Sequence, residues 1–178
     1  MSRTNPYKKK RRSAKRTLLM YGEGLGEEVF LKHLRSLYAY NSGVSVTIRN
    51  GKGGNPKSVV VNAINEPGDF KRRIVVLDND KKQKEMKQAC DEAKKKRVEI
   101  LENSPCLEAT LLSILRPGQN FSTKQSAWCK SEFETNYMDK KKRTELAEYI
   151  KIFSKQVLDN QRSNIAELNA FISIMENG

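Results

Sequence analysis

Short apolar runs divide the first two thirds of the chain into regularly spaced segments. Residues 17–21 and 44–48 are apolar or alternating runs rich in strand-forming side chains, and residues 74–77 form a continuous apolar run between charges. Uninterrupted runs of this length are typical of strands that are buried on both faces of a parallel sheet. Together with residues 98–101, the pattern predicts four strands.

Between and after these runs, apolar residues recur at helical spacing. In residues 25–40, for example, Phe30, Leu34 and Leu37 are separated by charged residues. The same spacing predicts helices over residues 25–40, 57–66, 81–97, 107–115, 144–158 and 162–176. Ser104 and Pro105 suit the N-cap and first turn of the helix at 107–115, and residues 117–143 are expected to be irregular. The alternation predicts an α/β fold with a mostly parallel four-stranded sheet flanked by helices, followed by a C-terminal helical extension.

Composition excludes several classes of protein. The chain has 178 residues and no apolar stretch near the length of a membrane span, and no signal peptide follows its basic start. Its three cysteines form no Cys-x-x-Cys pair, so neither a disulfide framework nor a structural zinc site is expected. We therefore expect a cytoplasmic protein of ordinary domain size with no membrane partner.

The positive charge is concentrated at the N-terminus. Residues 1–16 contain eight basic residues and no acid, out of a net charge of +13. We expect a flexible basic arm at 1–16, an α/β domain at 17–116, and a loop and helical extension at 117–178. The arm either contacts nucleic-acid phosphates or acts as a solubilising tail. Its candidate phosphate contacts are Lys8, Lys9, Lys10, Arg11, Arg12 and Arg16.

Acidic residues follow two of the predicted strands. Glu23 comes after the first strand, and Asp78 and Asp80 come after the third. Ligands gather at the carboxyl ends of parallel strands, so these carboxylates converge if the two strands are neighbours. Such a cluster suits Mg²⁺ or Mn²⁺ and the chemistry of phosphodiester hydrolysis. The alternative is that these acids serve only in turns and helix caps.

A glycine-rich basic loop at residues 51–58 lies between a strand and a helix and nearly matches a phosphate-binding P-loop. Pro56 stands where that motif requires glycine, and proline has no N–H to offer a phosphate. The remaining alternatives are a basic lip, with Lys52 and Lys57, that guides a nucleic-acid backbone, or a flexible turn with incidental charge.

The order of these motifs resembles the Toprim fold of topoisomerases, primases and OLD-family nucleases. The similarity extends to RloB-like proteins, a Toprim-related group linked to phage-defence loci. It covers roughly residues 8–115 and rests on five short segments in order, namely residues 8–16, 18–24, 51–56, 78–80 and 103–108. The turn after the first strand departs from the usual pattern, because Gly26 stands where a polar residue is more common.

The resemblance implies a metal-dependent nuclease that acts in anti-phage defence. It implies that Glu23, Asp78 and Asp80 are metal ligands and catalytic residues, that Glu27 is a second-metal ligand, and that Glu108 is a further ligand or orienting acid. Lys81 would stabilise charge on the phosphate, or is simply one of many solvated lysines. A partner ATPase is also implied.

Two other functions remain open from the sequence. The chain could be a non-catalytic nucleic-acid-binding module, whose binding is salt-sensitive and needs no metal. It could also be an adaptor subunit of a defence complex that docks a larger protein through its C-terminal helices. The sequence leaves open DNA against RNA as substrate, and whether the protein is a homo-oligomer.

Overall fold

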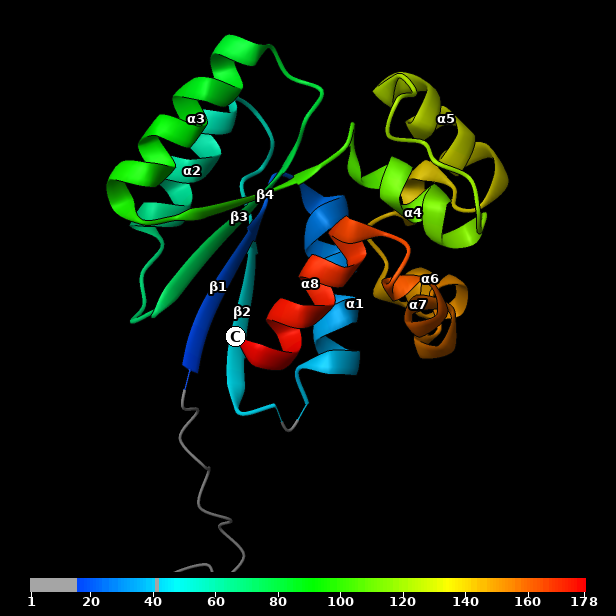
Figure 1. Cartoon of the computed structure of the whole chain (residues 1–178), viewed down its shortest axis with the longest axis horizontal. Coiled ribbons are helices and arrows are strands. Elements are labelled where there is room, and N and C mark those ends of the chain that lie inside the picture. Colours follow the sequence, from blue (N-terminus) through cyan, green and yellow to red (C-terminus); the bar gives the residue numbers. More distant parts are fainter. Residues whose placement is uncertain (1–15, 41) are drawn as a thin grey trace, which may run out of the picture.

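A computed structural model describes residues 16–40 and 42–178. The four predicted strands are confirmed as β1 (Arg16–Gly22), β2 (Val44–Asn50), β3 (Arg72–Asp78) and β4 (Glu99–Asn103) (Figure 1). The first four predicted helices are confirmed as α1 (Leu25–Tyr38), α2 (Pro56–Asn65), α3 (Gln83–Lys96) and α4 (Leu107–Leu115). Lys8, Lys9, Lys10, Arg11 and Arg12, predicted to contact phosphates, lie outside the described residues.

The strands form one sheet in the order β2-β1-β3-β4, and every neighbouring pair is parallel. This confirms the predicted four-stranded parallel sheet in an α/β fold. The two central strands, β1 and β3, are neighbours although α1, β2 and α2 separate them in sequence. Their carboxyl ends therefore lie side by side at one edge of the sheet.

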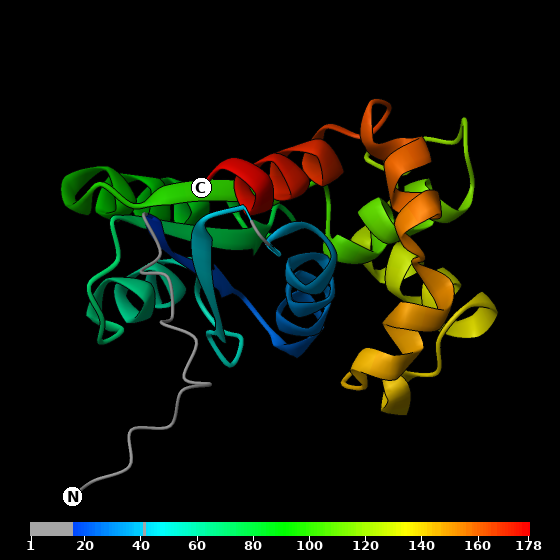
Figure 2. The ribbon, with the colours of Figure 1, turned by 90° about the horizontal axis from the view of Figure 1, so that it is seen from below.

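Helices cover both faces of the sheet, because successive side chains of a strand point to opposite faces. From β1, Leu19 and Tyr21 belong to the cluster with residues of α2 and α3, whereas Leu18 and Met20 belong to the cluster with α1 and α8 (Ala166–Asn177). Figure 2 shows α2 and α3 on one side of the strands and α1 and α8 on the other. In the same view, α4 and the helical segments between residues 126 and 162 lie beyond α1 and α8.

The C-terminal part differs from the prediction in two places. Residues 117–143 are not irregular throughout, since they contain α5 (Ser126–Asn136) and a short 3₁₀ helix at Lys140–Lys142. The predicted helix at 144–158 is two helices, α6 (Leu146–Ile152) and α7 (Lys155–Arg162), because Ser154 between them caps α7 by accepting from the Val157 amide at 3.3 Å. The last predicted helix is confirmed as α8 (Ala166–Asn177).

An aromatic cluster joins the C-terminal helices to α1. The ring of Phe30 in α1 lies 5.6 Å from that of Phe153 and 6.2 Å from that of Tyr149, centroid to centroid. Phe133 of α5 stacks on Phe153 at 6.5 Å. All four side chains are buried, so the C-terminal helices share a hydrophobic core with the sheet. In the part of the chain that the structure describes, no helix is both long and apolar enough to cross a membrane.

Candidate active site

Two carboxylates meet where β1 and β3 end. Glu23 directly follows β1, and Asp78 is the last residue of β3. The two strands are parallel and Gly22 pairs with Val76, so both acids reach the same edge. The Asp78 amide donates to Glu23 Oε2 at 3.3 Å, and the Glu23 amide donates to the Val76 carbonyl at 3.1 Å. The expected convergence of Glu23 and Asp78 is confirmed.

Glu27 reaches the same place from the first turn of α1. Its Oε2 accepts from the Gly24 amide at 2.9 Å, so the side chain of Glu27 folds back onto the N-cap residue of its own helix. A Cβ at Gly22 would come 2.7 Å from the Glu27 Cβ, so only glycine at position 22 lets α1 pack this close to β1. Burial, and to a smaller extent the charge of Glu23, raises the pKa of Glu27.

An open cleft of about 390 Å³ lies at this edge of the sheet. Its charged lining residues are Glu23, Glu27, Asp78, Glu108, Lys130, Lys140 and Arg143. Glu108 is 2% exposed, and Arg143 forms an ion pair with its Oε1. Its Oε2 is buried and has no hydrogen-bond partner among the described residues. The cleft therefore holds four carboxylates, and one buried oxygen has no donor or cation of its own.

The side chain of Asp78 also accepts a hydrogen bond from a free backbone amide at the start of α4. Its Oδ1 accepts from the Leu107 amide at 3.0 Å, where the helix begins. The prediction that Ser104 caps this helix is wrong: the N-cap position is Cys106, whose side chain makes no capping hydrogen bond, and Pro105 precedes the helix. An acceptor from a distant strand replaces the local cap, and the partial positive charge of the helix end favours a carboxylate there.

Burial changes the protonation of Asp78. Burial, and to a smaller extent the nearby charge of Glu27, raises the pKa of Asp78 to about 7. The ammonium group of Lys130 lowers this pKa but does not cancel the rise. The side chain of Asp78 is 7% exposed. Four acids in one poorly solvated place repel each other, so a cation at this position stabilises them.

Two lysines supply positive charge to these acids. Lys81 Nζ lies 3.1 Å from Glu23 Oε1 and 3.6 Å from Asp80 Oδ1. Lys130 Nζ lies 3.6 Å from Asp78 Oδ2 and 3.4 Å from Asp80 Oδ2. Asp78 and Asp80 thus point to the same side, as the Asp-x-Asp spacing predicts. Because they already contact ammonium groups, a metal ion at these oxygens must displace at least one lysine.

Asp80 lies beside the cleft, against α5. The Ser126 hydroxyl donates to Asp80 Oδ2 at 2.7 Å. Burial alone would raise the pKa of Asp80, but the Ser126 hydroxyl and the two ammonium groups outweigh it and leave the pKa below its ordinary value. Asp80 is therefore a charged carboxylate at neutral pH, whereas the pKa of Asp78 places its titration there.

The sequence analysis missed the residues that the C-terminal region brings to this site. Lys130 and Ser126 come from α5, and Arg143, which also binds Glu134 at 2.8 Å, follows the 3₁₀ helix. All of them lie in the segment predicted to be irregular. Cys129 and Phe133, buried and four residues apart, were the available signal for α5.

The glycine-rich loop lies against the backbone that carries Glu23. The Gly51 amide donates to the Gly22 carbonyl at 2.8 Å, the Gly53 amide donates to the Glu23 carbonyl at 2.8 Å, and Gly53 lines the cleft. The side chains of Lys52 and Lys57 are exposed. The backbone of the loop thus borders the cleft, whereas Lys52 and Lys57 are not among the cleft's lining residues, and their contact with nucleic acid stays a prediction.

Arg16, the one residue of the predicted arm within the described residues, is not at this site. It begins β1, at the opposite end of the strand from Glu23, and its guanidinium donates to the Asn177 carbonyl near the C-terminus (Figure 1). Its position there is explained by that contact.

As the side chains stand, the described residues contain no group of three or more His, Cys, Asp or Glu positioned to hold a metal ion. The donor set itself suits a hard cation, since every candidate ligand is a carboxylate oxygen. The ammonium groups of Lys81 and Lys130 lie at the oxygens that such an ion needs.

No protein-family profile matches this chain, and searches of the curated proteins and of the solved structures also give no significant match.

Proposed function

We propose that this protein is a metal-dependent nuclease with a Toprim-like fold, similar to the RloB-like proteins of phage defence. The observation that carries the proposal is the meeting of four buried acids, Glu23 and Asp78 among them, in one cleft at the joined ends of β1 and β3. Buried acids from distant segments are costly to place together unless positive charge lies among them, and a bound cation would add to the charge that Lys81 and Lys130 supply. The basic residues around the cleft suit a phosphate substrate.

Glu23, Asp78 and Asp80 would hold the ion, with Glu27 and Glu108 as further acids in the same cleft. Bound Mg²⁺ or Mn²⁺ supplies charge neutralisation at the phosphate and a reactive water. Lys81, released from Glu23, would then face the phosphate. Arg143 would keep Glu108 in place in the wall of the cleft through their ion pair. A partner ATPase remains part of the proposal through the resemblance alone.

The test is a cleavage assay on labelled DNA and RNA with and without divalent metal, using Glu23→Gln and Asp78→Asn. Both variants keep an oxygen that can accept from the Asp78 or Leu107 amide, so folding is preserved. We expect at least a ~100-fold loss of metal-dependent cleavage, the usual cost of losing a group that stabilises a developing charge. Glu167→Gln on α8, outside this site, is the matched control. Wild-type rates in Glu23→Gln would contradict the proposal.

One observation favours a second candidate, the non-catalytic binding module. The ammonium groups of Lys81 and Lys130 already neutralise Glu23, Asp78 and Asp80. If these ion pairs are permanent, the acids are structural and the basic surface only binds nucleic acid. Binding that is indifferent to EDTA, together with no cleavage at any metal concentration, would support this candidate.

A further inference from the structure

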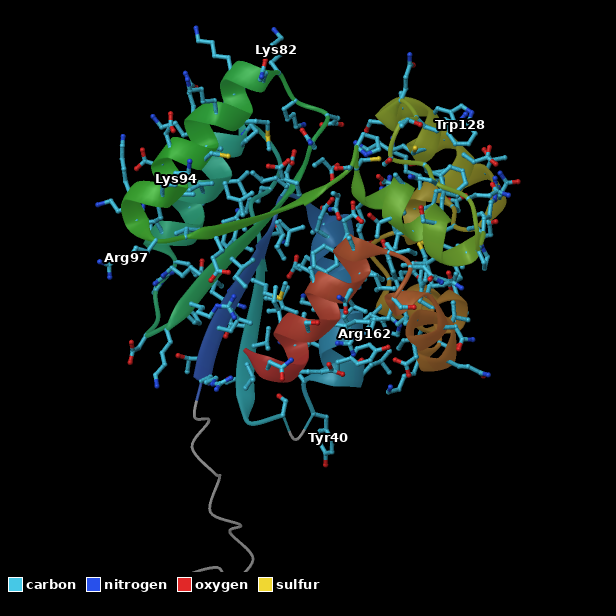
Figure 3. All side chains as sticks on the ribbon, viewed as in Figure 1. Tyr40, Lys82, Lys94, Arg97, Trp128 and Arg162 are labelled. Carbon is cyan, nitrogen blue, oxygen red and sulfur yellow. The ribbon has the colours of Figure 1, made fainter. Side chains whose placement is uncertain are left out.

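The outer face of α3 carries a strip of lysines that no contact in the fold explains. Its inner residues, Met86, Ala89 and Ala93, are buried against the sheet. Its exposed basic residues and those flanking it are Lys82, Lys84, Lys87, Lys94, Lys95, Lys96 and Arg97. Figure 3 shows Lys82 at one end of the helix and Lys94 and Arg97 on its outer side toward the other end.

Helix stability explains only part of this strip. Lys94, Lys95 and Lys96 lie in the last turn, where the helix dipole favours positive charge. Lys82 and Lys84 lie at the first turn, where the same dipole disfavours it, and Lys82 makes no capping hydrogen bond. Lysines at that end cost the helix stability, so their presence needs another explanation.

Ion pairing does not explain the strip either. Within the described residues, Lys95 is the one lysine of α3 that forms an ion pair, with Glu92 at 3.9 Å. Lys84, Lys87 and Lys94 form no ion pair within the described chain, although the exposed Asp91 lies one turn from Lys87 and Lys94. Their charges are therefore available to an external anion.

The strip begins at the candidate active site. Lys81, which contacts Glu23 and Asp80, directly precedes Lys82 at the N-cap of α3. From there the helix extends about 21 Å at ~1.5 Å per residue. This length matches about six base pairs of duplex at ~3.4 Å per step along one strand.

The side chains of α3 distinguish between three anionic partners, namely a membrane surface, a single strand and a duplex. Membrane-surface helices insert an apolar face, but the apolar face of α3 is buried in the fold. Single strands are held by stacking on aromatic side chains, and α3 contains none. Among the described residues, the exposed aromatics Tyr40 and Trp128 lie on other elements. A charged face without stacking groups fits the phosphate backbone of a duplex.

We infer that the outer face of α3 binds the backbone of double-stranded nucleic acid and leads it to the carboxylate cleft. The inference rests on the proposed function for the role of the cleft, but the binding itself needs no catalysis. It assigns a duplex as the substrate class and predicts little sequence preference, because the contacts are to phosphates.

The test measures binding in EDTA, so that cleavage plays no part. Fluorescence anisotropy follows labelled DNA and RNA duplexes and the matching single strands against the full chain over a series of salt concentrations. The variant Lys84→Gln, Lys87→Gln, Lys94→Gln removes three charges and keeps good helix formers. We expect at least a ~10-fold loss of duplex affinity. The salt slope should also be smaller by about 2 to 3, because each phosphate that a lysine neutralises adds ~0.9 to it.

The control is Lys142→Gln, Lys151→Gln, Lys155→Gln, which removes the same number of charges from exposed lysines of other elements, two of them ion-paired with Glu148 and Asp159. Equal effects of the two variants, or tighter binding to single strands or to anionic vesicles than to duplexes, would overturn the inference. Duplex binding through α3 without metal-dependent cleavage would leave the inference standing and reject the nuclease. Metal-dependent cleavage, together with duplex binding by the α3 variant as tight as that of the wild type, would leave the nuclease proposal standing and reject the inference about α3.

Discussion

At the scale of single residues, the site is a competition between ammonium groups and a metal ion for the same oxygens. Lys81 and Lys130 occupy the positions between Glu23, Asp78 and Asp80. A divalent ion concentrates more charge than an ammonium group and binds several carboxylate oxygens at once, so it can replace the lysines there. The lysines then serve two states, as counter-ions before the metal binds and as phosphate contacts afterwards.

Lys81→Met tests this competition. Removing the ammonium group should raise the affinity for Mg²⁺ by about fivefold, equivalent to ~1 kcal/mol. The same variant should cleave more slowly, because Lys81 no longer faces the phosphate. Isothermal titration and single-turnover cleavage separate the two effects, with Lys142→Met as the control. Weaker Mg²⁺ binding in Lys81→Met would show that Lys81 supports the ion in place of competing with it.

The raised pKa of Asp78 predicts how the thermal stability of the protein depends on pH. Burial, followed by the charge of Glu27, raises the pKa of Asp78 to about 7 from an ordinary value of 3.8. A raised carboxyl pKa stabilises the fold at low pH, and this contribution is lost as pH rises through the folded value. We expect the Tm of the metal-free protein to fall as pH rises from about 4 to about 7, and Asp78→Asn to remove part of that fall.

Thermal melts of both proteins at several pH values measure this effect, and added Mg²⁺ should restore wild-type Tm most at the alkaline end. Parallel Tm curves for wild type and Asp78→Asn would show that Asp78 does not titrate in this range.

At the scale of elements, the ends of helices and strands decide what sequence alone can predict. Glu23 and Asp78 could be placed together because the carboxyl ends of parallel neighbours share one edge, and β1 and β3 are neighbours. The break between α6 and α7 could not be placed, because Ile150, Phe153 and Val157 keep helical spacing across it. Lys130 and Arg143 reach the cleft through tertiary packing, which leaves no mark in local spacing.

Phe153, at the junction of α6 and α7, holds the C-terminal helices to the rest of the fold. Its ring packs on Phe30 and Phe133 and is fully buried. Phe153→Ala should lower the free energy of unfolding by about 3 to 5 kcal/mol, the usual cost of removing a buried aromatic ring. Phe153→Leu, which fills most of the space, should cost about 1 kcal/mol. Urea denaturation measures the free energy of unfolding of both variants. Equal losses in the two would show that the ring contacts of Phe153 do not stabilise this junction.

At the scale of the whole molecule, the sheet supplies the acids and the C-terminal helices supply the cations. Glu23 and Asp78 come from the edge of the sheet, whereas Lys130 comes from α5 and Arg143 follows the 3₁₀ helix, both in the region joined to the sheet by the shared aromatic core. The α3 strip leads away from the same edge on the other face. Among the described residues, Lys81, Lys130 and Arg143 thus lie at one acidic cleft and the α3 strip begins beside it, an arrangement that suits a polyanionic substrate.

The central claim is that Glu23, Asp78 and Asp80 bind one divalent ion together. Titration of the full chain with Mn²⁺, followed by electron paramagnetic resonance, measures it directly. We expect one bound ion per chain, and a loss of affinity of at least ~10-fold in both Glu23→Gln and Asp80→Asn, since each removes a charged ligand. No saturable Mn²⁺ binding, or binding that neither substitution weakens, would contradict the claim.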